Sequence, residues 1–110
     1  MASETDWPRI AELYAALSAR SGSPVVELNR AVALAMAYGP QAGLDLVDQL
    51  AAVPALRDYH LLPSVRGDLL ARLGRPAEAQ REFQRAAALT GNERERTLLL
   101  GRAAEHQAGS

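Results

Sequence analysis

The chain has 110 residues, enough for one domain with a modest core, and its 48% hydrophobic content argues against disorder. Twelve basic residues, all of them arginine, stand against thirteen acidic residues, and this balance argues against a dedicated nucleic-acid surface. The absence of cysteine excludes disulfides, thiolate metal sites and a cysteine nucleophile.

Glycine and proline divide the chain into segments in which apolar residues recur at helical spacing. The first helix is expected from about Asp6 to Arg20, with Thr5 or Asp6 as its N-cap. Its apolar face consists of Ile10, Leu13, Tyr14 and Leu17. The second helix begins at Ser23-Pro24, an N-cap followed by a first-turn proline, and ends at Tyr38-Gly39. Its apolar residues are Val25, Leu28, Val32 and Met36.

The third helix is expected to begin at Pro40 and to end near Ala52, with a buried stripe of Leu44, Val47 and Leu50. The longest connection, VPALRDYHLLP, leads into a fourth helix that reaches about Leu73. Pro63 falls near the first turn of that helix, where the missing N–H of proline is tolerated best. Gly74 is expected to end it.

Pro76 opens the fifth helix, which is expected to reach about Leu89, with Gly91 as its C-terminal glycine. Asn92, followed three residues later by Glu95, matches a capping box and predicts a sixth helix to about His106. The fold is therefore predicted to be all-α, with about six antiparallel helices. Charged residues interrupt every apolar run well before the ~18 residues of a membrane span. The opening MASETDWPRI lacks the features of a signal peptide, so we expect a cytoplasmic protein that does not contact membranes.

One stretch, SVRGDLLARLGRPAEAQREFQRAAALTG, shows an internal pattern formed by Gly67, Leu70, Gly74, Ala79, Phe83 and Ala86. A shift of 36 residues places Ala31 under Gly67 and Val47 under Phe83, and a shift of 34 places Gly101 under Gly67. A period of this length indicates an array of helical hairpins. Small residues then belong where two backbones approach most closely, and Phe83 fills the gap beside them.

With these residues the unit resembles the tetratricopeptide repeat (TPR) family, whose pattern it meets in full. The preceding unit departs from the pattern at two positions, with Tyr38 in place of the turn glycine and Gly43 in place of alanine. We interpret the chain as a single TPR-like domain, residues 1–110. Its parts are a half hairpin (about 6–20), two hairpins (24–52 and 59–89) and a final helix (92–106).

A narrower resemblance covers residues 5 to about 102. The blocks TDWPRIAELYAAL, SPVVELNRAVALAMAYGPQAGLDLVDQL, YHLLPSVRGDLLARLGRPAEA and AALTGNERERTLLLGR are similar, in order, to the C-terminal extension of a group of extracytoplasmic-function sigma factors. In that family the extension follows two sigma regions that bind DNA and polymerase, so we expect this chain to be the C-terminal part of a longer protein. The resemblance implies control of transcription initiation through contacts with the sigma regions of the same chain or with RNA polymerase core.

The resemblance also implies a concave face, lined by the first helix of each hairpin and suited to holding a peptide. The helix order of the family places these residues on it: Leu28, Asn29, Val32, Met36, Ser64, Asp68, Ala71, Arg72, Leu98 and Arg102. Asparagine is unfavourable in the middle of a helix, so Asn29 either bonds to a neighbouring hairpin or binds a ligand. We favour the structural role for Asn29.

Metal and cofactor binding are not expected. The two histidines, His60 and His106, have no third ligand at helical spacing, and His60 beside Tyr59 is interpreted as a packing residue at a helix start. The arginines near the C-terminal end, Arg94, Arg96 and Arg102 together with Arg72, have two interpretations: a basic cluster that contacts a phosphate or an acidic peptide, or a solvated surface balanced by Glu93, Glu95 and Glu105. We favour the solvated surface.

Catalysis is not expected either. The carboxylate pairs Glu78/Glu82 and Asp45/Asp48 are each about one helical turn apart, but arginines surround them, which favours solvated ion pairs over acid–base chemistry. The alternative to the sigma-factor interpretation is a free-standing TPR scaffold, or a module that forms a homodimer through its terminal helices.

Overall fold

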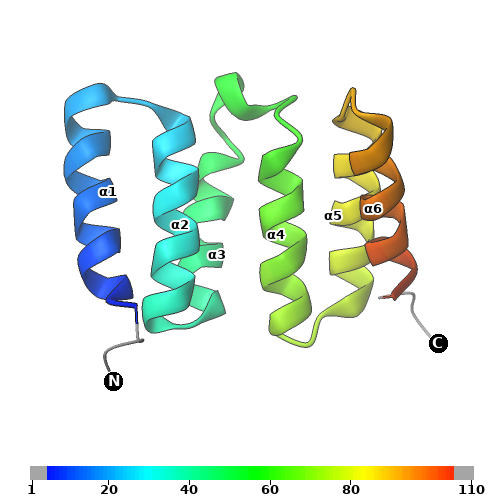
Figure 1. The fold of residues 1–110 in the computed structure, drawn as a ribbon, viewed down its shortest axis with the longest axis horizontal. Helices are drawn as coiled ribbons and strands as arrows, with labels where there is room; N and C mark the ends of the chain where they lie inside the picture. Colours follow the sequence, from blue (N-terminus) through cyan, green and yellow to red (C-terminus); the bar gives the residue numbers. More distant parts are fainter. Residues whose placement is uncertain (1–4, 106–110) are drawn as a thin grey trace.

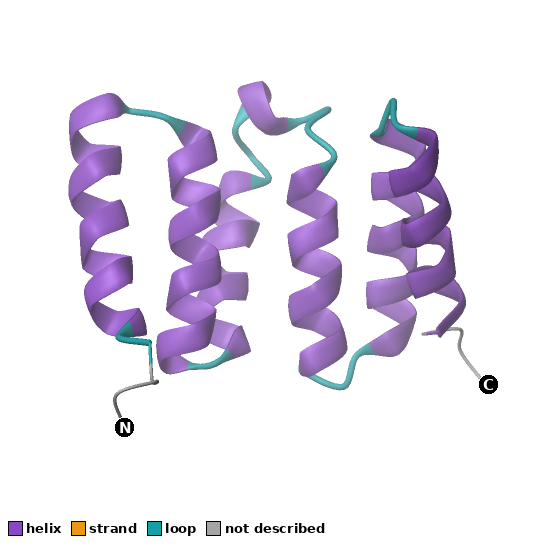
Figure 2. Cartoon of the chain, in the orientation of Figure 1, coloured by secondary structure: helices purple, strands orange, loops and turns teal. Residues whose placement is uncertain are grey.

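The computed structural model describes residues 5–105, which form six α-helices and one 3₁₀ turn (Figures 1 and 2). The elements are α1 (Trp7–Ser21), α2 (Pro24–Tyr38), α3 (Pro40–Leu50), η1 (Pro54–Leu56), α4 (Leu61–Arg72), α5 (Pro76–Leu89) and α6 (Glu93–Glu105). There is no strand in this part of the chain, so the prediction of an all-α array of hairpins is confirmed. The predicted end of the last helix at His106 lies outside the described residues.

The helices follow one another as antiparallel neighbours, and each packs against the next in the chain. Figure 1 shows α2 and α4 side by side in front, with α3 behind them and α5 behind α6. The first helices of successive pairs, α2, α4 and α6, therefore share one face of the molecule. No helix in the described range is long and apolar enough to cross a membrane.

Most helix ends follow the predicted capping chemistry. The side chain of Asp6 accepts a hydrogen bond from the Arg9 N–H (3.2 Å), and that of Ser23 accepts one from Val26 (3.4 Å). Gly74, two residues past the end of α4, has a φ of 73°, a left-handed conformation that glycine adopts without steric cost. These signals fixed the boundaries of α1, α2 and α4 to within one or two residues.

The fifth helix ends at Leu89, as predicted, but the expected role of Gly91 as its C-terminal glycine is wrong. The C-cap is Thr90, which is extended (φ −74°, ψ 141°). Arg96 in α6 instead reaches back and donates to the carbonyls of Ala87 (3.1 Å) and Thr90 (2.8 Å). Because a guanidinium satisfies these carbonyls at the end of the helix, no left-handed glycine is required there.

The core is built where small residues allow close helix approach. Phe83, on α5, is fully buried, and a Cβ added to Gly67 would lie 2.9 Å from its ring. In the preceding pair, a Cβ on Gly43 would lie 2.6 Å from the carbonyl oxygen of Ala31. The predicted pairing of small residues with Phe83 is confirmed for the Gly67 unit. Gly101 differs, because a Cβ there would have no neighbour within 4 Å.

One feature was not expected from the sequence, and a second agrees with the alternative of a module that pairs through its terminal helices. The long connection contains η1, and Leu56 within it is buried in the main core. On α1, by contrast, Leu13 and Leu17 are 59% and 49% exposed, and only Ala11 is buried. The apolar face of α1 is thus only partly used in the packing against α2.

The Gly43→Ala substitution tests the close approach of α2 and α3. We expect it to lower the free energy of unfolding by about 1–3 kcal/mol, because the new methyl group would overlap the backbone of α2. Urea denaturation measures the change. The matched control is Gly101→Ala, which also lies within a helix but in open space and should stabilise the chain by about 0.5–1 kcal/mol. Equal effects at the two positions would contradict this account of the packing.

Candidate functional site: a groove across α2, α4 and α6

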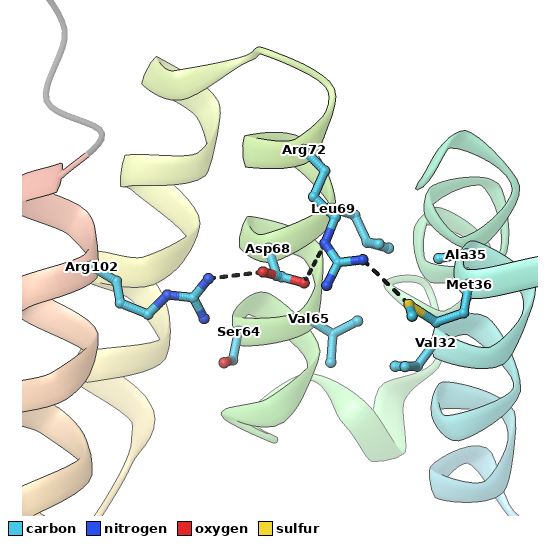
Figure 3. A pocket seen from close by; sticks show the side chains of 9 residues that line it. All are labelled: Val32, Ala35, Met36, Ser64, Val65, Asp68, Leu69, Arg72 and Arg102. Carbon is cyan, nitrogen blue, oxygen red and sulfur yellow. Dashed lines mark hydrogen bonds and ion pairs between the residues drawn. The ribbon is translucent and has the colours of Figure 1, made fainter. Parts of the chain in front are cut away.

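A hollow of about 260 Å³ lies on the shared face of α2, α4 and α6 (Figure 3). Six of the predicted concave-face residues line it: Val32, Met36, Ser64, Asp68, Arg72 and Arg102. Three further lining residues were not predicted: Ala35, Val65 and Leu69. We call this hollow the α2–α4–α6 groove. Its volume is slightly below the ~300–1,000 Å³ of typical small-molecule sites, and suits one or two side chains of a partner.

The α4 wall of the groove follows from helical spacing. Ser64, Asp68 and Arg72 are four residues apart, and Val65 and Leu69 form a parallel row one position later. The neighbouring residues Gly67 and Leu70 point the other way, into the core. The repeat pattern identified Gly67 and Leu70 as core positions of α4. The same helical periodicity, applied to positions one or two residues away, would have identified Val65 and Leu69 on the groove side.

Four predicted residues lie outside the groove. Leu28 is buried in the core and does not line the hollow. Asn29 is exposed and its side chain forms no hydrogen bond to another described residue, so the favoured role as a bond to a neighbouring hairpin is wrong. Leu98 is 66% exposed and lines a separate depression along α6, and Ala71, half-buried, packs at the edge of the core.

A chain of polar contacts crosses the groove from α6 to α2 (Figure 3). Nη2 of Arg102 donates to one carboxylate oxygen of Asp68 (2.8 Å), and Nε of Arg72 lies 3.1 Å from the other. Nη1 of Arg72 donates to the sulfur of Met36 (3.4 Å). These contacts link α2, α4 and α6, which are not consecutive in the chain. We call them the polar bridge.

The guanidinium of Arg102 lies over the face of an aromatic ring, that of Phe83. Its Cζ lies 4.4 Å from the centroid of the Phe83 ring, within the range of a cation–π interaction. Phe83 is itself fixed in the core against Gly67. The position of Arg102 in the groove therefore depends directly on the packing of α4 against α5.

The interpretation of the C-terminal arginines as one balanced surface needs correction. Arg72 and Arg102 share Asp68 in the groove. Arg96 caps α5 and pairs with Glu93, and Arg94 lines the depression along α6. The sequence did not separate these roles, because they depend on where α6 lies relative to α4 and α5.

The predicted capping box at the start of α6 is only half formed. Oδ1 of Asn92 accepts from the Glu95 N–H (2.9 Å), as predicted, but the Asn92 N–H donates to Thr90 (3.2 Å). The carboxylate of Glu95 instead lies 2.6 Å from Nε2 of His60, at the start of α4. The ring of His60 also packs edge-on against that of Tyr59, with 5.7 Å between centroids, so the expected packing role is confirmed.

The carboxylates considered for catalysis are engaged in ion pairs and hydrogen bonds. Asp48 of α3 and Glu82 of α5 both accept from Arg66 of α4, at 2.9 and 2.8 Å. Glu78 pairs with Arg75 at the start of α5. In the part of the chain that the structure describes, no group of three acidic, histidine or cysteine residues is placed to hold a metal ion.

The chain is similar to part of a longer bacterial protein. An uncharacterized protein of Rhizobium meliloti is 46% identical over 89 residues, which are 81% of this chain but 21% of the relative. The chain thus spans about a fifth of the length of the curated relative that it matches. No family model and no solved structure matches the chain.

The charge pair on α2 makes a testable contribution to stability. The Arg30 guanidinium donates to both carboxylate oxygens of Glu27 (2.7 and 3.0 Å) and thereby lowers the pKa of Glu27. A carboxylate with a lowered pKa gives stability that is present above its unfolded pKa and is lost as the pH falls toward the folded pKa. We expect Glu27→Gln to cost up to about 1 kcal/mol of unfolding free energy at neutral pH.

This difference between wild type and Glu27→Gln should shrink as the pH falls below the unfolded pKa of glutamate, about 4.3, and should disappear only below the lowered pKa that Glu27 has in the folded state. Urea denaturation at a series of pH values measures it. Glu12→Gln, an exposed position on α1 with no ion pair to another described residue, is the control and should show a smaller effect. A cost that stays constant down to acidic pH would contradict the ion-pair explanation.

Proposed function

We propose that this chain is a non-catalytic protein-interaction domain that holds a segment of a partner protein in the α2–α4–α6 groove. The observation that supports this most is that three separate helices contribute side chains to one hollow, with apolar walls and exposed guanidinium groups. Asp68, the acidic residue of the groove lining, is held between two arginines. This arrangement favours recognition over proton transfer.

The partner that the sequence favours belongs to transcription. The four blocks that resemble the C-terminal extension of extracytoplasmic-function sigma factors cover nearly the whole chain. On this basis the groove contacts the sigma regions of the same chain or RNA polymerase core, and so modulates transcription initiation without binding nucleic acid itself. A tether to the sigma regions would raise their effective concentration, so that a weak groove contact is sufficient.

A second candidate is a TPR scaffold or dimerisation module unrelated to transcription. Two observations favour it: the exposed leucines of α1, Leu13 and Leu17, and those of α6, Leu98 and Leu100. Exposed apolar residues at both terminal helices are typical of surfaces that pack against further protein. In this case the groove and the terminal helices would serve different partners.

The test measures binding of the chain to separately purified sigma regions and to core polymerase, at low and moderate salt. The Val32→Trp variant fills the groove, while Val25→Trp adds the same bulk on the same helix at a residue that does not line the groove. The two valines are similarly exposed, 38% and 42%. We expect Val32→Trp to weaken binding by tenfold or more and Val25→Trp to leave it unchanged, with the helical circular dichroism of both intact.

Equal affinity of the two variants would reject the groove as the binding face. Binding to neither sigma regions nor polymerase, together with a mass that rises with protein concentration in sedimentation, would favour the dimerisation candidate instead.

A further inference from the structure

The groove carries an excess of positive charge. Its lining residues include two arginines, Arg72 and Arg102, and one carboxylate, that of Asp68. Both arginines share this one carboxylate, and their side chains remain 49% and 34% exposed. The net charge on an otherwise apolar hollow favours a ligand that brings one negative charge.

Arg72 has weaker partners than several other arginines of the chain. Arg30 and Arg75 each donate two hydrogen bonds to one glutamate, and Arg66 donates to two different carboxylates. Arg72 shares its carboxylate with Arg102, and its Nη1 donates to the thioether of Met36. A thioether is a weak acceptor, so a carboxylate that displaced Met36 from Nη1 would gain a charge-assisted hydrogen bond.

Arg102 is positioned to bind the same acidic group of the ligand as Arg72. Its guanidinium lies over the Phe83 ring and is oriented by the hydrogen bond to Asp68. A cation held in this way loses little side-chain entropy when a ligand binds. Arg102 is therefore already oriented for ligand binding on the α6 side of the groove (Figure 3).

The remaining surface of the groove is aliphatic. Val32 and Met36 of α2 face Val65 and Leu69 of α4 across the hollow. An aliphatic side chain beside the acidic group of the ligand would be buried between these two walls. A nucleic-acid strand offers no aliphatic side chain and many phosphates, and matches this combination less well.

We infer that the groove selects an extended protein segment in which an aspartate or glutamate lies next to an aliphatic residue, with the acidic side chain bound by Arg72 and Arg102. This inference rests on the proposed function, since it names the chemistry of the segment that the groove holds. It further assigns Asp68 as a competitor of the acidic side chain for the same two arginines.

The test begins with a phage-displayed library of random short peptides, selected on the wild-type chain and counter-selected on Val32→Trp. The peptides that remain are those whose binding requires the open groove. Each is synthesised with an amidated C-terminus, once with its acidic residue and once with the matching amide. Fluorescence anisotropy then measures their affinity for wild type, Arg72→Gln, Asp68→Asn and the control Arg85→Gln, an exposed arginine of α5 with no ion pair to another described residue.

We expect the selected peptides to be enriched in acidic–aliphatic pairs. Arg72→Gln should weaken the acidic peptide by about tenfold and leave the amide peptide nearly unchanged. Asp68→Asn should strengthen the acidic peptide several-fold, an effect that a merely structural role of Asp68 would not produce. Arg85→Gln should bind both peptides as wild type does.

Groove-dependent peptides without an acidic residue, or acidic peptides indifferent to Arg72→Gln and Asp68→Asn, would overturn the inference and leave the proposed function intact. Competition by a single-stranded oligonucleotide as strong as that by the acidic peptide would overturn it in favour of phosphate binding. If no selected peptide discriminates wild type from Val32→Trp, the proposed function itself fails, and the inference with it.

Discussion

The packing of one aromatic ring connects the core of this protein to its candidate binding face. Phe83 fills the space that Gly67 leaves on α4, and the guanidinium of Arg102 of α6 lies over its ring. Arg102 then orients Asp68, the residue that follows Gly67 in the chain. Because adjacent helical residues point about 100° apart, one short stretch of α4 contributes both to the core and to the groove. A change in the spacing of α4 and α5 would therefore disturb the polar bridge as well as the core.

The fold was predictable from the sequence because its determinants are local or periodic. Capping residues, first-turn prolines and Gly74 set the helix boundaries, and the repeated small residues set the pairing of helices. The failures occurred where contacts between different helices replaced a local rule. Arg96 caps α5 in place of a left-handed Gly91, and Glu95 faces His60 rather than closing the capping box. Neither contact can be derived without knowing how α6 lies against α4 and α5.

The candidate site was predicted in outline but not in detail. The helix order of the resembling family correctly brought together residues of α2, α4 and α6, since the first helix of each pair lies on one face. It could not distinguish a core position such as Leu28 from a groove position such as Val32, because both are aliphatic and one turn apart. The contact of Arg72 with Met36 was also beyond prediction, because it depends on the distance between α2 and α4, which are not consecutive in the chain.

The central claim is that Phe83 lies between Gly67 and Arg102 and so joins the core to the groove. Proton NMR tests it most directly, through the ring-current shifts of the Gly67 α-protons and the Arg102 δ-protons. The account predicts upfield-displaced signals for both residues in the wild-type chain, and their return toward ordinary positions in Phe83→Leu. Ordinary shifts for both residues in the folded wild-type protein would contradict it.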